Sequence, residues 1–414
     1  MFWSTPLTFV NAKVIGDGGR LARTIRIKGR RVDGVDVAPD KGDAVVDLED
    51  SFVFPGLINA HDHLELNSQP RLKWRERYDN ASQWIADFQP RFRTDPALAV
   101  TTPDTLDDRL WIGGLKNLLS GVTTVCHHNP LHRTLRRRFP VRVVNQFGYS
   151  HSLQIDGEAV TASHRKTPPD WPWMIHAGEG CDREAARELD TLDRLGCLTP
   201  NTVLIHGIGF CATAAARVIT AGAGLVWCPS SNDFLFKRTA DVRAFDDADR
   251  LALGSDSRLS GEGDLLDELK AAHATRQLSA EGLARTVTTG AARLLRLQAS
   301  AGRLASGVPA DLTIVRPLAA CPFDALVSAT RADVRLTMID GKPCVAEPSL
   351  AGAYEAAGVA AMAARLDGAP RLVARWIGRH VSQMQLQERG FELDPDRRLV
   401  RRSLGEGGSL GGVG

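Results

Sequence analysis

The sequence predicts an α/β fold: most of a (β/α)8 barrel of the TIM type, joined to a small sheet domain that both ends of the chain form. Between residues 55 and 301, apolar strand-like runs alternate with helical segments, a pattern typical of parallel βα units. From Leu7 to Val53 the runs are short, alternating or β-branched, and separated by Gly and Asp. The same pattern returns in "ADLTIVRP" and "VRLTMIDGKPCVA". The two ends are therefore expected to share one sheet.

The expected barrel strands are apolar runs that end in polar or small residues. They cover residues 56–63, 122–128, 141–151, 173–179, 202–209, 224–231 and 251–257. Between them, residues 105–121 and 182–196 have helical patterns. Thr105 is the expected N-cap of the first helix, while Gly121 and Gly196 mark the two C-terminal ends.

These patterns divide the chain into three parts. Residues 1–54 and 302–346 are expected to form the small sheet domain, and residues 55–301 the barrel. Residues 347–414 form a C-terminal extension. In this extension we expect two helices, at 350–366 and 371–389, before a disordered Gly-rich tail, "GEGGSLGGVG".

Composition excludes several function classes. The 414 residues carry a formal net charge of +2, with no long single-sign block before the Arg-rich "LRRRF" and "PDRRLVRRS", so nucleic acid is not an expected partner. Seven scattered cysteines without a C-x-x-C pair indicate reduced thiols. No leader and no apolar stretch of membrane-spanning length stand out. We expect a cytoplasmic homo-oligomer, most simply a dimer, that acts on a small molecule away from membranes.

The stretch "FPGLINAHDHLELN" places two histidines at the end of the first barrel strand. Side chains two apart on a strand point to the same side, so His61 and His63 can share a metal site. Catalytic groups of such barrels lie at the carboxyl ends of several strands. His176, His206 and Asp256 end three further strands. Imidazoles with a carboxylate suit zinc, iron(II) or manganese(II).

Each of these residues has a plainer interpretation when taken alone. A single His or Asp after an apolar run is more often a structural residue, and for His206 alone that interpretation is preferred. Four strand-end placements together favour a metal site. Glu179 follows His176 in "HAGEG" and is placed to move a proton between water and a leaving group. Without His176 nearby, Glu179 would be interpreted as a solvated residue at a helix start.

Five ordered segments, "PGLINAHDH", "HAGE", "IHG", "WCPSSN" and "LGSDS", resemble the amidohydrolase superfamily, in particular the adenosine and cytosine deaminases and the triazine-hydrolase-like group. The later "ASAGRLASGVPADLTIV" resembles the return of that group into its β-sandwich. The resemblance implies that His61, His63, His176 and Asp256 hold one divalent metal ion, with zinc expected and iron(II) or manganese(II) as alternatives. It also implies that Glu179 is the proton shuttle, and that His206 stays off the metal to orient the hydroxide and stabilise the tetrahedral intermediate.

A binuclear member of the superfamily would need a carboxylated lysine on the fourth strand. Between the third and fifth strands the only lysine is Lys166, in the polar "SHRKTPPD", so a mononuclear site is expected. The sequence also departs from the family pattern here. Only "SLQIDGEAVTASHRKTPPD" stands where the family has a helix and a further strand, so the fourth strand is expected to be abbreviated.

The predicted activity is the hydrolytic deamination of an amino-substituted N-heterocycle, of the purine, pyrimidine, pterin or triazine type, by a metal-bound hydroxide. Hydrolysis of a cyclic amide or of another C–N or C–halide bond is the alternative. A non-catalytic scaffold of the same fold would be expected to have lost ligands, and this sequence keeps them. Candidate substrate contacts lie near the strand ends or could stack on a heterocycle. They are Glu65, Trp84, His128, Gln146, Ser150, Asn232 and Arg258.

Overall fold

Two parallel sheets form the centre of the protein. The structure, a computed structural model, describes residues 5–16, 20–92, 94–98 and 105–394. One sheet has the order β10-β9-β8, and the other has the order β11-β12-β13-β14-β15; all their pairings are parallel. The strands are β8 (Leu57–Asp62), β9 (Val122–His127), β10 (Arg142–Val143), β11 (Gly148–Tyr149), β12 (Trp173–Ala177), β13 (Thr202–His206), β14 (Gly224–Trp227) and β15 (Leu251–Leu253). The predicted α/β class with parallel strands is confirmed.

One extended segment, residues 142–150, touches both sheets. At its start Val144 N donates to Val125 O, and at its end Ser150 N donates to Met174 O, at 2.9 and 3.0 Å. The described chain between β11 and β12 holds only the helices α3 (Leu153–Asp156) and α4 (Ala159–Lys166). The fourth of the parallel strands is thus abbreviated, as the sequence predicts: it is the two-residue β11, which pairs with β12. On the opposite edges, Asp256 N donates to His61 O at 3.1 Å.

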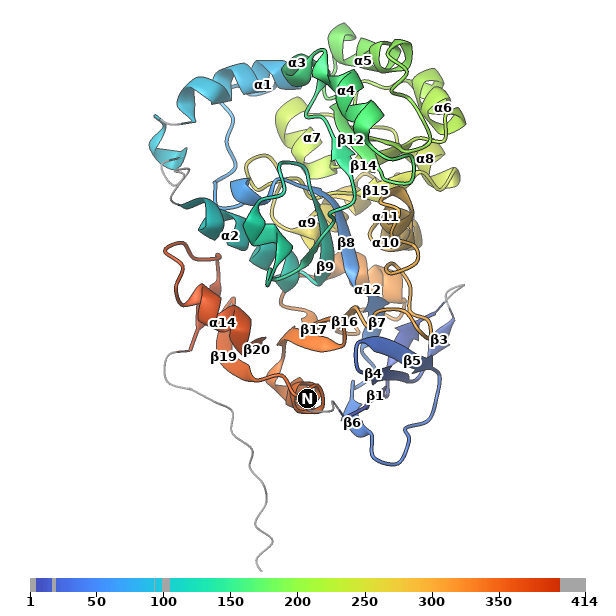
Figure 1. Cartoon of the computed structure of the whole chain (residues 1–414), viewed down its shortest axis with the longest axis vertical. Helices are drawn as coiled ribbons and strands as arrows, with labels where there is room; N and C mark the ends of the chain where they lie inside the picture. The colour runs from blue at the N-terminus through green and yellow to red at the C-terminus, as the bar shows by residue number, and fades with distance from the viewer. Residues whose placement is uncertain (1–4, 17–19, 93, 99–104, 395–414) are drawn as a thin grey trace, which may run out of the picture.

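Helices follow the strands and cover the parallel sheets (Figure 1). Their bounds are α1 (Ala81–Phe88), α2 (Leu106–Leu119), α5 (Arg183–Arg194), α6 (Ala212–Thr220), α7 (Pro229–Phe236), α8 (Arg243–Asp247), α9 (Leu265–Ala274), α10 (Ala280–Thr286), α11 (Thr289–Leu294) and α12 (Pro322–Ser328). The expected ends of α2 and α5 at Gly121 and Gly196 are confirmed, since both have positive φ. Thr105 stands at the predicted N-cap position of α2, but its side chain makes no capping hydrogen bond and accepts instead from Arg109 Nε.

The two ends of the chain share a nine-stranded sheet, as predicted. Its order is β21-β19-β20-β18-β17-β16-β7-β2-β3, in which β7 from the N-terminal part pairs with β16 from the C-terminal part. These strands lie side by side below the parallel sheets in Figure 1. A second sheet has the order β5-β4-β1-β6. The bounds are β1 (Leu7–Val10), β2 (Lys13–Ile15), β3 (Leu21–Ala22), β4 (Ile25–Lys28), β5 (Arg31–Val35), β6 (Ala44–Asp47), β7 (Phe52–Pro55), β16 (Leu312–Val315), β17 (Val334–Ile339) and β18 (Lys342–Ala346).

The prediction of two long helices after residue 347 is wrong. Between residues 347 and 394 the only α-helices are α13 (Ala351–Ala356) and α14 (Arg375–Val381), while β19 (Ala361–Leu366), β20 (Ala369–Ala374) and β21 (Phe391–Leu393) join the nine-stranded sheet. Asp367 and Gly368 both have positive φ and turn β19 back onto β20, which is the turn chemistry that a two-residue hairpin prefers. The alanine-rich pattern concealed this turn. The Gly-rich tail lies outside the described residues.

Within the part of the chain that is described, no helix combines the length and the apolar character needed to cross a bilayer.

Candidate metal and active site

The predicted ligands converge at the carboxyl ends of the parallel strands. His61, His176 and His206 each place one ring nitrogen within 4.8 Å of the others, and His61, His63 and Asp256 form a second such group. All five side chains are buried, with at most 8% exposure. His61 is the penultimate residue of β8, His176 lies in β12, His206 ends β13 and Asp256 follows β15. Residues from distant parts of the sequence meet because parallel strands all end at one face.

Hydrogen bonds to the second ring nitrogen orient these imidazoles. His176 Nδ1 donates to the carbonyl of His151 at 2.7 Å. His128 Nε2 donates to the carbonyl of Ser150 at 2.9 Å, which leaves its Nδ1 to accept from His61 Nδ1 at 3.3 Å. The Nε2 lone pairs of His61 and His176 then face each other at 3.4 Å with no proton between them. A cation between them would remove this repulsion, and such carbonyl partners are typical of metal-bound histidines.

Burial keeps these imidazoles neutral. Desolvation, followed by the neighbouring histidines, holds the pKa of His61 and of His176 well below the ordinary value. Burial alone would raise the pKa of Asp256, but His63, His206 and the Ser231 hydroxyl together lower it. The cluster therefore offers neutral nitrogens and an anionic oxygen, the protonation states in which these residues bind a metal.

Asp256 and His206 have left-handed backbone conformations, with φ of 52° and 78°. Such angles are uncommon for residues other than glycine and persist where the surroundings fix them. The Asp256 carboxylate accepts from the hydroxyls of Ser231 and Ser260 at 2.8 and 2.9 Å. His206 Nδ1 donates to Asn232 Oδ1 at 2.8 Å. The left-handed turns thus aim two side chains that hydrogen bonds then hold in place.

Glu179 faces the same space. Its Oε1 lies 3.6 Å from His206 Nε2, and burial raises the pKa of its carboxyl to about 7. A carboxyl with such a pKa can accept and release a proton near neutral pH. The predicted proton-shuttle residue is therefore next to the metal-ligand candidates and next to His206.

A cavity of about 200 Å³ opens onto this cluster. His63, His176, Glu179, His206 and Asp256 line its inner end. Apolar side chains line much of the rest, and they include Leu66, Trp84, Ile85, Phe88, Ile155, Leu235 and Leu259. Trp84, a predicted substrate contact, stacks on Phe88 with ring centroids 5.1 Å apart. The space is suited to a flat, largely apolar ring with a polar edge toward the histidines.

The other predicted substrate contacts do not line this cavity. His128 and Ser150 lie behind His61, and Asn232 holds His206. Gln146 is exposed. It lies in the segment of residues 142–150 that contacts both parallel sheets. These positions correct the predicted roles. The His128 ring, the Ser150 carbonyl and the Asn232 side chain support the histidines of the cluster.

Glu65 and Arg258 are likewise turned elsewhere. Glu65 accepts from Asn129 Nδ2 and lies 3.8 Å from His127 Nδ1. The Arg258 guanidinium is bound in a bidentate pair by Glu388, at 2.7 and 2.8 Å. That carboxylate lies far along the chain, so sequence spacing gave no sign of it.

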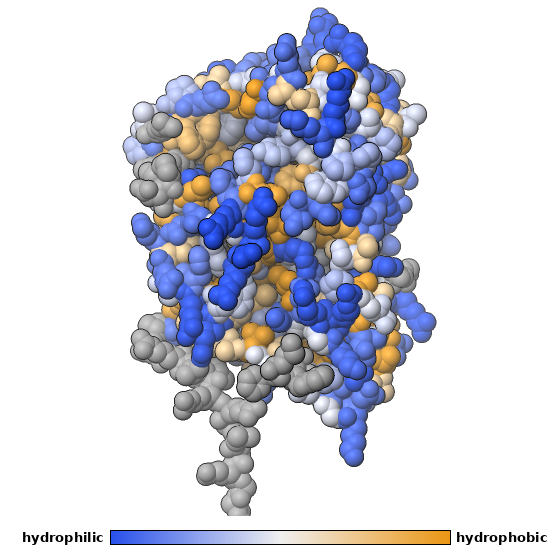
Figure 2. Space-filling model, in the orientation of Figure 1, coloured by the Kyte–Doolittle hydropathy of each residue, from blue (hydrophilic) through white to orange (hydrophobic). Residues whose placement is uncertain are grey.

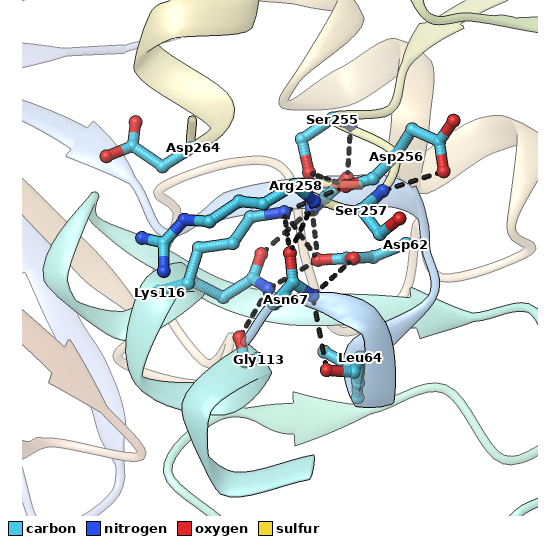
Figure 3. A network of polar contacts seen from close by, with 12 residues as sticks. Asp62, Leu64, Asn67, Gly113, Lys116, Ser255, Asp256, Ser257, Arg258 and Asp264 are labelled. Atoms are coloured by element: carbon cyan, nitrogen blue, oxygen red, sulfur yellow. Dashed lines mark hydrogen bonds and ion pairs between the residues drawn. The ribbon is translucent and has the colours of Figure 1, made fainter. Parts of the chain in front are cut away.

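A buried network under the metal-ligand candidates escaped the sequence analysis (Figure 3). Lys116 Nζ donates to Asn67 Oδ1 and to the carbonyl of Asp256, both at 2.8 Å, and lies 3.1 Å from Asp62 Oδ2. Lys116 and Asp62 have no exposed side-chain surface. Asp62 stands between His61 and His63 in the sequence. One ammonium therefore ties the segment with both histidines to the turn with Asp256.

The close approach of α2 makes this contact possible. Gly113 lies against Leu64, and a Cβ at Gly113 would come within 2.4 Å of the Leu64 carbonyl oxygen. Asn117, one turn further along α2, also donates to Asp62 Oδ2 at 2.8 Å. Glycine at position 113 thus lets the helix place Lys116 and Asn117 directly beneath the histidine pair.

The site combines buried histidines and an aspartate at the ends of parallel strands with a carboxyl group beside them. This is the type of site found in metal-dependent hydrolases. The model of the Amidohydrolase family matches residues 170–344 of the chain. That match contains His176, Glu179, His206 and Asp256, and it begins after His61.

Two curated proteins and one solved structure illustrate what the chain is similar to. The 5-methylthioadenosine/S-adenosylhomocysteine deaminase of Halobacterium salinarum is 27% identical over 368 residues, covering 73% of this chain and 83% of that protein. The 8-oxoguanine deaminase of Pseudomonas aeruginosa is 32% identical over 157 residues, or 34% of this chain and 35% of that one. Among solved structures, atrazine chlorohydrolase from Arthrobacter aurescens TC1, complexed with zinc, is similar with a TM-score of 0.70 at 18% identity, covering 83% of this chain and 96% of that chain.

Proposed function

We propose that the protein is a metal-dependent hydrolase that removes an amino group from an N-heterocycle and releases ammonia. The observation that carries this proposal is the position of Glu179, which faces one cavity together with His206 and the histidine and aspartate cluster. The two relatives named above as deaminases of adenosine-type and guanine-type compounds support an aminopurine as the substrate class. The apolar walls around Trp84 and Phe88 would stack on such a ring.

We assign the metal site to His61, His63, His176 and Asp256, with one zinc ion. The facing Nε2 lone pairs of His61 and His176 and the anionic Asp256 fit a divalent cation. When bound, the ion would supply Lewis acidity and lower the pKa of water at the site.

The protein's own groups then move the protons. Glu179 takes a proton from the attacking water and passes it to the ring nitrogen or the leaving amino group. Asn232 fixes His206 so that Nε2 points toward Glu179 and the cavity. A proton shared between Glu179 and His206 Nε2 provides a hydrogen-bond donor where negative charge develops on the substrate. The apolar cavity walls exclude water from these transfers.

A screen for ammonia release tests the proposal. Zinc-loaded protein should release ammonia from at least one aminopurine, and not from the same ring without the amino group. Pyrimidines, pterins and triazines complete the screen, and chloride detection with chlorotriazines covers loss of halide. Halide release or ring opening without ammonia would contradict deamination and favour the other hydrolytic reactions of such a site.

Elemental analysis should find one divalent ion per chain. The reason is the donor set: Lys166, the lysine nearest in sequence to the expected fourth strand, ends the polar helix α4 and does not lie on a parallel strand. Two ions per chain, both lost in His176→Ala, would contradict the mononuclear assignment.

His206→Asn should lower kcat by roughly 10²–10³-fold with the metal content unchanged, because His206 acts on charge in the transition state. His164→Asn is the matched control, since His164 bonds Thr199 at 3.0 Å in α4, outside the cavity lining. A metal-free His206→Asn protein would instead place His206 among the ligands, consistent with its distance from His61 and His176.

The closure of the barrel and the extent of the β-sandwich are part of the same proposal. We infer that the two parallel sheets close into one barrel over residues 55–301, joined through residues 142–150 on one side and through the Asp256 to His61 hydrogen bond on the other. Residues up to 54 and from 302 onward would form the β-sandwich, since β7 from the first part pairs with β16 from the second in one sheet. The revised sandwich includes the strands up to β21. A cytoplasmic homodimer without nucleic-acid partners remains the expected form.

A further inference from the structure

A second cavity lies apart from the metal site, where α2, α14 and the turn between β17 and β18 meet. Its volume is about 730 Å³, and none of its lining residues lines the cavity at Glu179. Trp111 and His380 stack at 3.6 Å and form its floor. Trp376, with 38% of its surface exposed, stands at the wall with its ring centroid 6.2 Å from that of Trp111. We call this space the basic cleft.

Positive charge concentrates in the basic cleft. Its lining includes Arg30, Arg138, Lys342, Arg375 and Arg379 and contains neither Asp nor Glu. Arg30 pairs with Asp340, but the other four make no ion pair with any described residue. The whole chain has a formal net charge of only +2, so this accumulation is local. Arg375 and Arg379 are four residues apart and share one face of α14, a like-charge spacing that is unfavourable in a helix.

An adjoining cavity of about 710 Å³ extends the positive charge. It shares Arg30, Arg138, Lys342 and Trp376 with the basic cleft and adds Arg136 and Arg137 from the Arg-rich segment of the sequence. Arg142 also lines it, but this guanidinium is paired with Asp311 and Asp340. Arg138 has φ of 52°, a left-handed conformation that is costly for arginine and is often found where a side chain is held for a function. In Figure 2, strongly hydrophilic side chains cross the middle of the face on which α2 and α14 lie.

We propose that the basic cleft binds a small polyanion with a flat aromatic ring, of the nucleoside polyphosphate class. Guanidinium groups match phosphate oxygens with two parallel hydrogen bonds, and such a group would neutralise the four cations that make no ion pair within the described part of the chain. The partly exposed indole of Trp376 offers a stacking face for the ring. The volume is in the range of small-molecule sites. This ligand is separate from the substrate of the proposed deaminase and does not depend on that activity.

Calorimetry with the full-length, zinc-loaded protein tests this proposal with ATP, tripolyphosphate and adenosine as probes. ATP should bind with an affinity that falls as salt rises, and tripolyphosphate should bind more weakly because it lacks the ring. Arg375→Ala/Arg379→Ala should weaken ATP binding about tenfold or more, as expected from loss of charge-assisted hydrogen bonds. Trp376→Ala should remove the preference for ATP over tripolyphosphate.

The control is Arg183→Ala/Arg187→Ala, which removes two exposed arginines at the same spacing on α5 and should leave ATP binding unchanged. Adenosine reports on the catalytic cavity, and neither double variant should change its binding. No ATP binding at about 1 mM would overturn the proposal. Equal weakening in both double variants would also overturn it, as would ATP binding that Trp376→Ala and Arg375→Ala/Arg379→Ala both leave intact.

Discussion

Replacing Glu179 with glutamine should lower kcat by roughly 10²–10⁴-fold, the loss expected when a positioned general acid and base is removed. Glutamine keeps the shape of the side chain but cannot accept the proton, and Glu179 is not among the groups of residues that could hold an ion. Metal content should therefore remain that of the unchanged protein. Steady-state kinetics and elemental analysis of the same preparation measure both quantities.

Glu184→Gln is the matched control for this experiment. Glu184 is exposed in the first turn of α5, a few residues beyond Glu179, and its replacement should leave kcat unaltered. If the Glu179 variant stayed active with its metal bound, another group would have to move the proton. If it lost the metal, Glu179 would belong to the ligand set, and the separation of proton transfer from metal binding would fail.

Lys116→Met should lower the free energy of unfolding by about 3–5 kcal/mol, since it leaves the buried Asp62 carboxylate without its ammonium partner. The neutral methionine also loses the hydrogen bonds to Asn67 and to the Asp256 carbonyl. Adding Asp62→Asn in the same protein should recover much of the loss, because no uncompensated charge then remains. Urea denaturation at a fixed zinc concentration measures these differences.

Lys270→Met gives the comparison. Lys270 pairs with Asp267 at 3.3 Å on the surface of α9, with about a third of its side chain exposed. An exposed pair of this kind contributes at most about 1 kcal/mol. Equal destabilisation by the two lysine replacements, or no recovery with Asp62→Asn, would show that the buried ion pair does not hold the two halves of the metal site together.

Sequence reasoning succeeded where chemistry and strand periodicity coincide. His61, His176, His206 and Asp256 each follow an apolar run, and parallel strands bring such ends to one face whatever their separation along the chain. Glu179 could be placed because it follows His176 by three residues. The signal for these residues is local, so a single sequence contains it.

The sequence analysis missed residues whose partners lie far along the chain, and it missed residues on helices whose packing the sequence does not indicate. Lys116 lies in a helical pattern, where a lysine usually marks the solvent side, but here Gly113 lets that side of α2 press onto the histidine segment. The sequence gives little indication that α1 forms a wall of the cavity, since it shows only a modest apolar pattern around Trp84. The hairpin at Asp367 and Gly368 was signalled by its turn residues, and the surrounding alanines obscured them.

The pair between Arg258 and Glu388 has a consequence for the biosynthesis of the protein. Arg258 stands two residues beyond Asp256, and the Glu388 side chain has no exposed surface. Arg331 also reaches this carboxylate, at 3.2 Å. On the ribosome, the loop with Asp256 emerges long before the glutamate that neutralises its arginine. The loop can thus reach its final form only after Glu388 has been translated, and a product of premature termination before Glu388 would leave a buried guanidinium without this partner beside the metal site.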